Sequence, residues 1–286
     1  PFPTWLLSSM TAPTPASALM HAGFVNAGGV LLTRFAPVLT VDASAMLLVT
    51  VVGATSALFG KLLKTVQPDV KAQLGCSTVG QMGFMILQAG LGFFGAAITH
   101  LVLHGFYKAY QFLSSGEAVA HVAPGHGEPS RSTGSGGLLV AVPTGLAGGV
   151  VFAAVTGKGT SVDAGLLLTL LVVVTTLHAV RVAVRRTGLP APVHYGVVPA
   201  LALPAVAVYA LTYRLVTWAL RDLPVVTDPT ALTPVHALVA VGFLLAYVGA
   251  EYGLHERSER LYVTLVNAGR TPTAALTTAT EEYDAS

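Results

Sequence analysis

Charged residues are scarce in this sequence: they make up 10% of its 286 residues, where a typical soluble domain carries about a quarter. Hydrophobic residues make up 53%, and the mean hydropathy is +0.70. Apolar runs of about 20 residues recur along the chain, which is the length that crosses a bilayer as a helix. The shortage of charge therefore argues against an ordinary soluble domain and predicts an all-α, polytopic helical membrane protein.

Cysteine and basic patches are also scarce. The single Cys76 excludes an internal disulfide and a metal site built from cysteines. No cluster of basic residues with interleaved aromatic side chains is present, which argues against nucleic acid as a partner. The chain opens with PFPTWLL, without Met and without the regions of a signal peptide, so we expect it to begin inside a longer protein.

Eight transmembrane helices are predicted from the apolar runs. They cover 12–33, 44–66, 72–92, 96–116, 137–156, 164–182, 196–219 and 233–252. The fifth contains Pro143, Gly145, Gly148 and Gly149, so we expect that helix to break, as cavity-lining helices of transporters do.

The composition divides the chain into four regions. They are a first block of helices at 1–120, a flexible polar loop at 121–136, the remaining transmembrane helices at 137–252 and a polar tail at 253–286. The loop is rich in Gly, Ser and Pro, and the tail is expected to be partly disordered past Thr271.

The basic residues predict the orientation in the membrane. Most of them fall on one side if the spans alternate: Lys61, Lys64, Lys71, Arg131, Arg181, Arg185, Arg186, Arg257, Arg260 and Arg270. The positive-inside rule makes that side, and with it the C-terminus, cytoplasmic in the cell membrane. Among the basic residues only Lys108 and Arg214 lie in mid-span, and no acidic residue does. Lys108 is therefore expected to find its partner outside this stretch of chain or in water.

His100, His104 and Lys108 are spaced four residues apart, so a helix places them on one face. This stripe is roughly 12 Å long and lies among apolar residues. Ionisable groups at membrane depth are functional candidates, and imidazoles and a desolvated ammonium can pass protons through bridging water. The alternatives are polar groups that only join helices, or a zinc site, for which no third ligand is evident.

Further polar residues are candidates for the same pathway. His21 lies in mid-span among small residues, and Lys71 opens the third span at the predicted cytoplasmic mouth. Secondary candidates are Ser77, Thr78 and Gln81, which continue inward from Lys71, and Glu117 and His178, which we expect nearer the interface. Each of these also has a packing or anchoring interpretation, and Arg214 could either reach the outer surface or pair with another subunit.

Three stretches within residues 1–120 resemble a known family, the proton-conducting antiporter-like membrane subunits. They are PFPTWLLSSMTAPTPASALMHAGFVNAGGVLLTRFAP, QPDVKAQLGCSTVGQMGFMILQ and HLVLHGFYKAYQFLSSG, and they follow one another at the family's spacing. The family includes the distal membrane subunit of respiratory NADH:quinone oxidoreductase (complex I) and the large subunit of Mrp Na+/H+ antiporters. These stretches, and LYVTLVNAGRTPTA in the tail, are most similar to the DabB branch, the membrane subunits of DAB inorganic-carbon transporters.

The resemblance implies an antiporter-like fold of two inverted five-helix repeats with a broken helix, of which this chain would hold the C-terminal part. The pathway residues that it implies are His21, Lys71, His100, His104 and Lys108. The family's essential glutamate and its lysine on the first broken helix would lie before Pro1. Complex I and Mrp members also carry a lysine on the second broken helix, and the predicted fifth span has none, which favours the DabB branch.

The implied function is that of a membrane subunit that translocates H+ or Na+ and energises the accumulation of inorganic carbon, as CO2 or bicarbonate. The implied partner is a large soluble zinc-binding, DabA-like subunit that hydrates CO2, while this chain holds neither a metal nor another cofactor. It would be a transporter subunit and not an enzyme. Two alternatives stay open: a proton-translocating subunit of NADH:quinone oxidoreductase or an Mrp antiporter, and a structural membrane scaffold.

Overall fold

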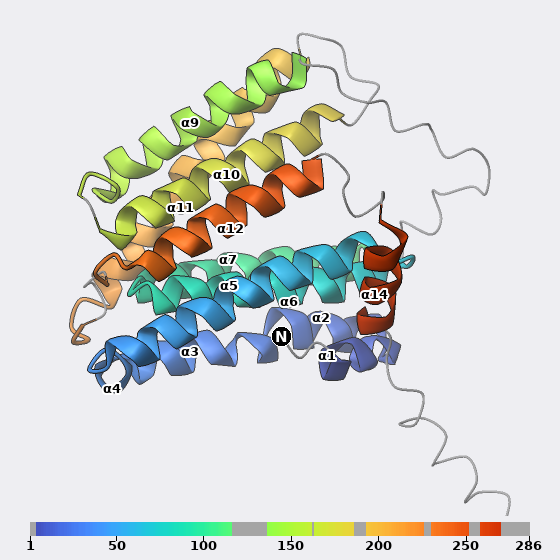
Figure 1. The fold of residues 1–286 in the computed structure, drawn as a ribbon, viewed down its shortest axis with the longest axis horizontal. Coiled ribbons are helices and arrows are strands. Elements are labelled where there is room, and N and C mark those ends of the chain that lie inside the picture. The colour runs from blue at the N-terminus through green and yellow to red at the C-terminus, as the bar shows by residue number, and fades with distance from the viewer. Residues whose placement is uncertain are drawn as a thin grey trace, which may run out of the picture.

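The computed structural model describes residues 4–115, 136–161, 163–185, 193–225, 230–251 and 258–269. These residues form helices joined by turns, and none of them forms a strand. The predicted all-α class is confirmed (Figure 1).

Each predicted span corresponds to helical structure. The last seven correspond to α5 (Ala43–Thr65), α6 (Val70–Gly90), α7 (Phe94–Leu113), α9 (Gly136–Thr156), α10 (Ala164–Arg185), α11 (Val198–Ala219) and α12 (Pro234–Glu251). The first is divided into α2 (Thr14–Ala22), the 3-10 turn η2 (Phe24–Asn26) and α3 (Ala27–Arg34). Shorter elements are α1 (Thr4–Ser8), η1 (Ser9–Thr11), α4 (Ala36–Leu39), η3 (Val193–Val197) and α14 (Glu259–Gly269).

Within the part of the chain that the structure describes, five helical segments are long and apolar enough to cross a membrane, which makes the chain a multi-pass membrane protein. They are Thr14–Arg34, Ala43–Thr65, Gly137–Thr156, Ala164–Val184 and Tyr195–Ala219. The apolar part of α12 is shorter. The helices α6 and α7 are as long as the others, but they carry more polar side chains, including those of the predicted pathway. The number of eight spans stays a prediction.

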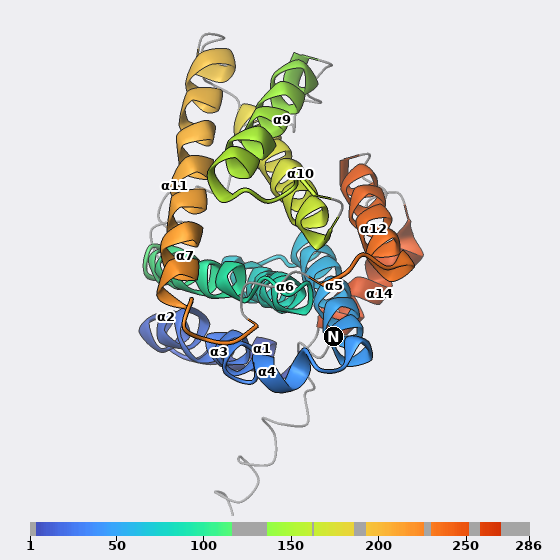
Figure 2. The same ribbon diagram turned by 90° about the vertical axis from the view of Figure 1, so that its left-hand side faces the viewer.

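The helices lie in three tiers, which two perpendicular views show in the same order (Figures 1 and 2). α1, α4 and α2–α3 form one outer tier, and α5, α6 and α7 form the middle. The other outer tier consists of α9, α10, α11 and α12. The helix with the predicted stripe, α7, is therefore covered on both sides.

Small residues bring α5 and α6 into backbone contact. A methyl group added to Gly60 would overlap the backbone of Gly80, and one added to Gly83 would overlap Ala57. Gly53 meets the backbone of Leu87 in the same way. Lipid gives helices little hydrophobic reason to associate, so close packing of small residues supplies much of the attraction in membranes. The same helix, α6, presents Ser77 to Lys108 of α7.

The helix break expected in the fifth span is absent, because α9 runs without interruption through Pro143. In that turn the Thr144 hydroxyl donates a hydrogen bond of 2.7 Å to the Val140 carbonyl. The missing N–H of Pro143 removes the helical donor only from the carbonyl of Leu139. The glycines have a packing role, since a methyl group on Gly149 would overlap Val173 of α10.

The break lies instead in the first predicted span, directly after His21. α2 ends at Ala22 and the chain passes through η2 before α3 begins. The Asn26 side chain donates a hydrogen bond of 2.6 Å to the Ala22 carbonyl, which the break would otherwise leave unpaired.

The predicted polar tail contains a helix, α14, at the end of the bundle where α5 ends. Leu265 of α14 is buried against Leu63 and Val66. Figure 1 shows α14 crossing the end of the bundle rather than running along it. The residues past Thr271 lie outside the described part of the chain.

Replacement of Gly60 by alanine should destabilise the protein, although alanine is the better helix former. The added methyl group has to separate two backbones, which costs about 1–3 kcal/mol. Thermal unfolding of the detergent-purified full-length protein measures the effect. Gly242→Ala is the matched control, because a methyl group there meets nothing within 4 Å. An unchanged midpoint for Gly60→Ala would contradict the proposed close contact.

Candidate functional site

The stripe on α7 faces the protein interior. The side chain of Lys108 is fully buried, His104 is 5% exposed and His100 is half-buried. The rings of His100 and His104 lie 5.7 Å apart between centroids. Tyr107 and Phe106, on the opposite face, are exposed. The helical spacing therefore predicted the arrangement correctly: one polar face points inward and one apolar face points outward.

Lys108 is held by neutral groups of α6. Its Nζ donates to the carbonyl of Leu74 at 3.2 Å and to Ser77 Oγ at 2.9 Å. No carboxylate in the described part of the chain forms an ion pair with it. Thr78 is buried beside Ser77, but its hydroxyl donates to the Leu74 carbonyl of its own helix. Of the two predicted hydroxyl candidates, Ser77 contacts the stripe directly.

His21 extends the stripe from α7 to α2. Its side chain is fully buried, and its ring stacks on Phe112 at 4.6 Å. It lies close enough to Lys108 and Lys71 for their charges to act on it, and His104 is within the same reach of His21. Neither ring nitrogen of His21 or His104 has a hydrogen bond within the described residues. Buried imidazoles of this kind are available to bind or release a proton through water.

Lys71 lies in the first turn of α6, near the end of the stripe that Lys108 forms. Its Nζ donates a hydrogen bond of 2.6 Å to the carbonyl of Ala12, in the segment that leads into α2. Asp69 caps α6 by accepting from the Ala72 backbone N–H at 2.9 Å. Lys71 thus joins α6 to α2, the helix that carries His21.

A cavity of about 860 Å³ adjoins the other end of the stripe. Its polar lining includes His100, Ser77, Gln81, Gln88, Tyr209, Lys61, Lys64 and His178. Ser77 and Gln88 are 11 residues apart on α6, a helical length of about 16 Å. The cavity therefore runs along much of α6, and His100 borders it.

The structure places His178 at one end of this cavity. Its Nε2 lies 2.8 Å from Lys61 Nζ, which joins α10 to α5. His178 was predicted to be interfacial, and Lys61 was considered only as a charge that sets orientation. Their contact puts both residues at the cavity end nearest the predicted cytoplasmic side. Glu117, the remaining candidate, lies outside the described residues.

Gln88 and Tyr209 are polar residues of the cavity that were not among the predicted candidates. Gln88 Nε2 donates a hydrogen bond of 3.1 Å to the Tyr209 hydroxyl, across 121 positions of sequence. Gln88 is visible in the sequence as an amide in an apolar run, MILQAG, and that was the available signal. Nothing local in the sequence connects it to Tyr209. Arg214, whose role the sequence left open, is exposed on α11.

The site is thus a chain of titratable and hydroxyl side chains inside an apolar bundle. It leads from Lys71 and His21, past Lys108, His104 and His100, into the cavity. Among the described residues, no group of three or more His, Cys, Asp or Glu side chains could hold a metal ion. The chemistry that these groups support is proton exchange between imidazole, ammonium, hydroxyl and water.

Transmembrane helices that enclose buried basic groups define a class, the polytopic membrane proteins with ionisable residues at membrane depth. Sequence comparison assigns the family within that class. The chain belongs to the family described as NADH:quinone oxidoreductase/Mrp antiporter, transmembrane, whose sequence model matches residues 1–185. The resemblance found in the three sequence stretches is confirmed.

Curated relatives come from two branches of this family. The chain is 51% identical over 119 residues (42% of this chain, 23% of the relative) to a probable inorganic carbon transporter subunit DabB of Bacillus subtilis. It is 47% identical over 129 residues (45% and 23%) to the probable subunit DabB1 of Halothiobacillus neapolitanus. NADH-quinone oxidoreductase subunit L of Mycobacterium tuberculosis is 42% identical over 161 residues (55% and 25%). The matches span about a quarter of the length of these relatives.

The cavity should be wet and accessible from the side of Lys61. In the full-length protein, we expect a Gln81→Cys variant to react with a charged, membrane-impermeant methanethiosulfonate reagent, because the thiolate forms only in contact with water. The native Cys76 is fully buried and gives a low background. The control is Leu211→Cys, since Leu211 is 57% exposed on α11 but does not line the cavity. Equal protection of both thiols from the reagent would show that the cavity is dry.

Proposed function

We propose that this chain is part of an ion-translocating membrane subunit that energises the accumulation of inorganic carbon. The observation that carries the proposal is the buried array of His21, His104 and Lys108, because ionisable groups are costly at membrane depth and mark functional sites there. Relatives from 42% to 51% identical that are named as inorganic carbon transporter subunits support the substrate class.

The proposed pathway uses the predicted residues His21, Lys71, His100, His104 and Lys108. A proton would enter at Lys71, on the predicted cytoplasmic side, or leave there. It would pass between Lys71 and Lys108 by way of His21, and along α7 through His104 to His100. Lys108 is suited to this step because its hydrogen bonds are to a carbonyl and a hydroxyl, which do not hold it permanently charged as a carboxylate would.

The proposed assembly places the chain in the cell membrane, with α14 and the C-terminus on the cytoplasmic side. Lys61, Lys64, Lys71 and His178 lie at the same end of the bundle as α14, which agrees with that orientation. The proposed partner is a large soluble zinc-binding subunit, where the ion gradient would be coupled to hydration of CO2. In this proposal the membrane subunit translocates the ion, and the soluble partner carries out the hydration.

A second candidate is a proton-translocating subunit of an NADH:quinone oxidoreductase. The 161-residue match to subunit L favours it, because that match covers more of this chain than the DabB matches do. The higher identities favour the inorganic carbon transporters. The two candidates differ in the partner and share the buried array, so both need Lys108.

The Lys108→Ala variant tests the pathway in the assembled, full-length complex. We expect ion-driven transport to be abolished while assembly persists, because the variant removes a buried cation whose partners are neutral. Lys108→Arg should also be inactive, since arginine keeps the charge but does not release its proton. Gradient-dependent uptake of inorganic carbon into vesicles measures transport, and size-exclusion chromatography measures assembly.

The matched control is Arg34→Ala, which removes an exposed cation at the end of α3. Full activity of both Lys108 variants would leave only the packing role for the array. Loss of assembly in Lys108→Ala but not in Arg34→Ala would assign Lys108 a structural role instead.

A further inference from the structure

A second polar stripe runs along α11, outside residues 1–185 that match the family. Tyr209, Tyr213 and Thr217 are spaced four residues apart and therefore share one face of this helix. Arg221 follows after another four residues, past the end of α11, and its side chain is 61% exposed. Tyr209 and Thr217 are 8 positions apart on the helix, which is about 12 Å.

The inner end of this stripe meets the cavity beside His100. Tyr209 lines the cavity, as do His100 and Gln88. The Tyr209 hydroxyl accepts a hydrogen bond from Gln88 Nε2, so its own proton is directed to another acceptor. Gln88 is only 1% exposed, and its Oε1 has no hydrogen-bond partner among the residues described. An unpaired buried carbonyl oxygen is costly unless water reaches it.

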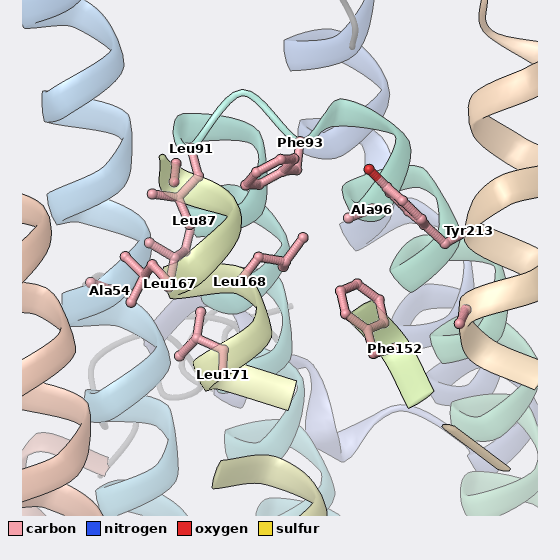
Figure 3. Close-up of a cluster of buried hydrophobic side chains, with 12 residues drawn as sticks. Ala54, Leu87, Leu91, Phe93, Ala96, Phe152, Leu167, Leu168, Leu171 and Tyr213 are labelled. Carbon is pink, nitrogen blue, oxygen red and sulfur yellow. The ribbon is translucent and has the colours of Figure 1, made fainter. Parts of the chain in front are cut away.

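The middle of the stripe is enclosed by α7 and α9. Tyr213 is 4% exposed, and Figure 3 shows it reaching from α11 toward α7, beside Ala96. The ring of Phe152, from α9, lies 6.1 Å from the rings of both Tyr209 and Tyr213. The two hydroxyls are thus carried by aromatic rings that are held in place by packing.

Thr217 continues the stripe toward the outer surface. Its Oγ1 has no hydrogen-bond partner among the described residues. Its Oγ1 is buried against the backbone of α7, since a methyl group on Gly95 would lie 2.5 Å from it. Arg221 and Asp222, which follow, form an exposed ion pair at 3.9 Å. The stripe therefore has one end in the cavity and the other at an exposed polar surface.

We propose that Tyr209, Tyr213 and Thr217 form the outward half of the proton path, with Gln88 as the residue that positions the Tyr209 hydroxyl. This inference rests on the proposed function of the α7 array. These residues would take the place of the lysine that complex I and Mrp members carry on the second broken helix and that α9 lacks. They connect His100, through the cavity, with the surface at Arg221.

Each hydroxyl on the stripe would transfer a proton without a change in its covalent bonding. Its oxygen accepts a proton from one side and its own proton passes to the next acceptor, so no net charge remains. Hydroxyls four residues apart on a helix are too far apart for direct hydrogen bonds, and single waters between them would complete the chain. Such a chain passes H+ and not Na+, which makes the proposal specific for the ion.

The test measures proton flux in proteoliposomes that contain the assembled complex with the full-length subunit and an internal pH-sensitive dye. A potassium diffusion potential set by valinomycin drives the flux. We expect Tyr213→Phe, which removes only the hydroxyl, to lower the flux roughly tenfold or more. The control is Tyr195→Phe, since Tyr195 is 52% exposed and lies before the start of α11, away from the stripe. This control should conduct as the wild type does.

The Lys108→Ala variant is measured in the same assay and separates the two proposals. Wild-type flux in a Tyr209→Phe/Tyr213→Phe double variant, with Lys108→Ala inactive, overturns the outward path and leaves the α7 array intact. Wild-type flux in Lys108→Ala overturns the proposed function itself. If Tyr213→Phe fails to assemble, Thr217→Val removes another hydroxyl of the stripe at constant shape, and its unchanged flux would overturn the inference. Transport that is driven by Na+ alone would also do so.

Discussion

The contact between Lys108 and α6 is the interaction on which the arrangement of the site depends. A fully buried ammonium in an apolar bundle needs hydrogen-bond acceptors, and the carbonyl of Leu74 and the hydroxyl of Ser77 supply them. Those acceptors are in place because α6 is held by the backbone contact with α5, which only glycine allows at Gly60 and Gly83. A packing constraint between two helices thereby determines the surroundings of a charge on a third.

The same constraint explains why the middle tier carries the function. α7 lies between α2, which contributes His21, and the tier of α9–α12, which closes the cavity beside His100. The polar groups of α6 and α7 make these helices less hydropathic than their neighbours, and they need the surrounding apolar helices to shield them from lipid. The break after His21 fits this picture, because Asn26 satisfies the Ala22 carbonyl within the protein.

Much of the site could be predicted from local sequence, and the rest depended on long-range contacts. The four-residue spacing of His100, His104 and Lys108 predicts their common face because helix geometry is the same everywhere. The expected break at Pro143 was wrong, since α9 accommodates the proline and uses its glycines to pack against α10. The contacts of Lys61 with His178 and of Gln88 with Tyr209 join residues more than 100 positions apart. No periodic pattern encodes such pairs.

The sequence by itself determined the helical class, the family and the approximate positions of the long helices, because bilayer thickness and helix periodicity act on local composition. It also determined which side chains are ionisable in an apolar setting. Only the tertiary structure decided that His21 joins the α7 array, that neutral groups hold Lys108, and that a cavity connects His100 with Tyr209. The physical reason is that hydrogen bonds and cavities depend on how helices pack against one another, and that packing is set by contacts distributed over the whole chain.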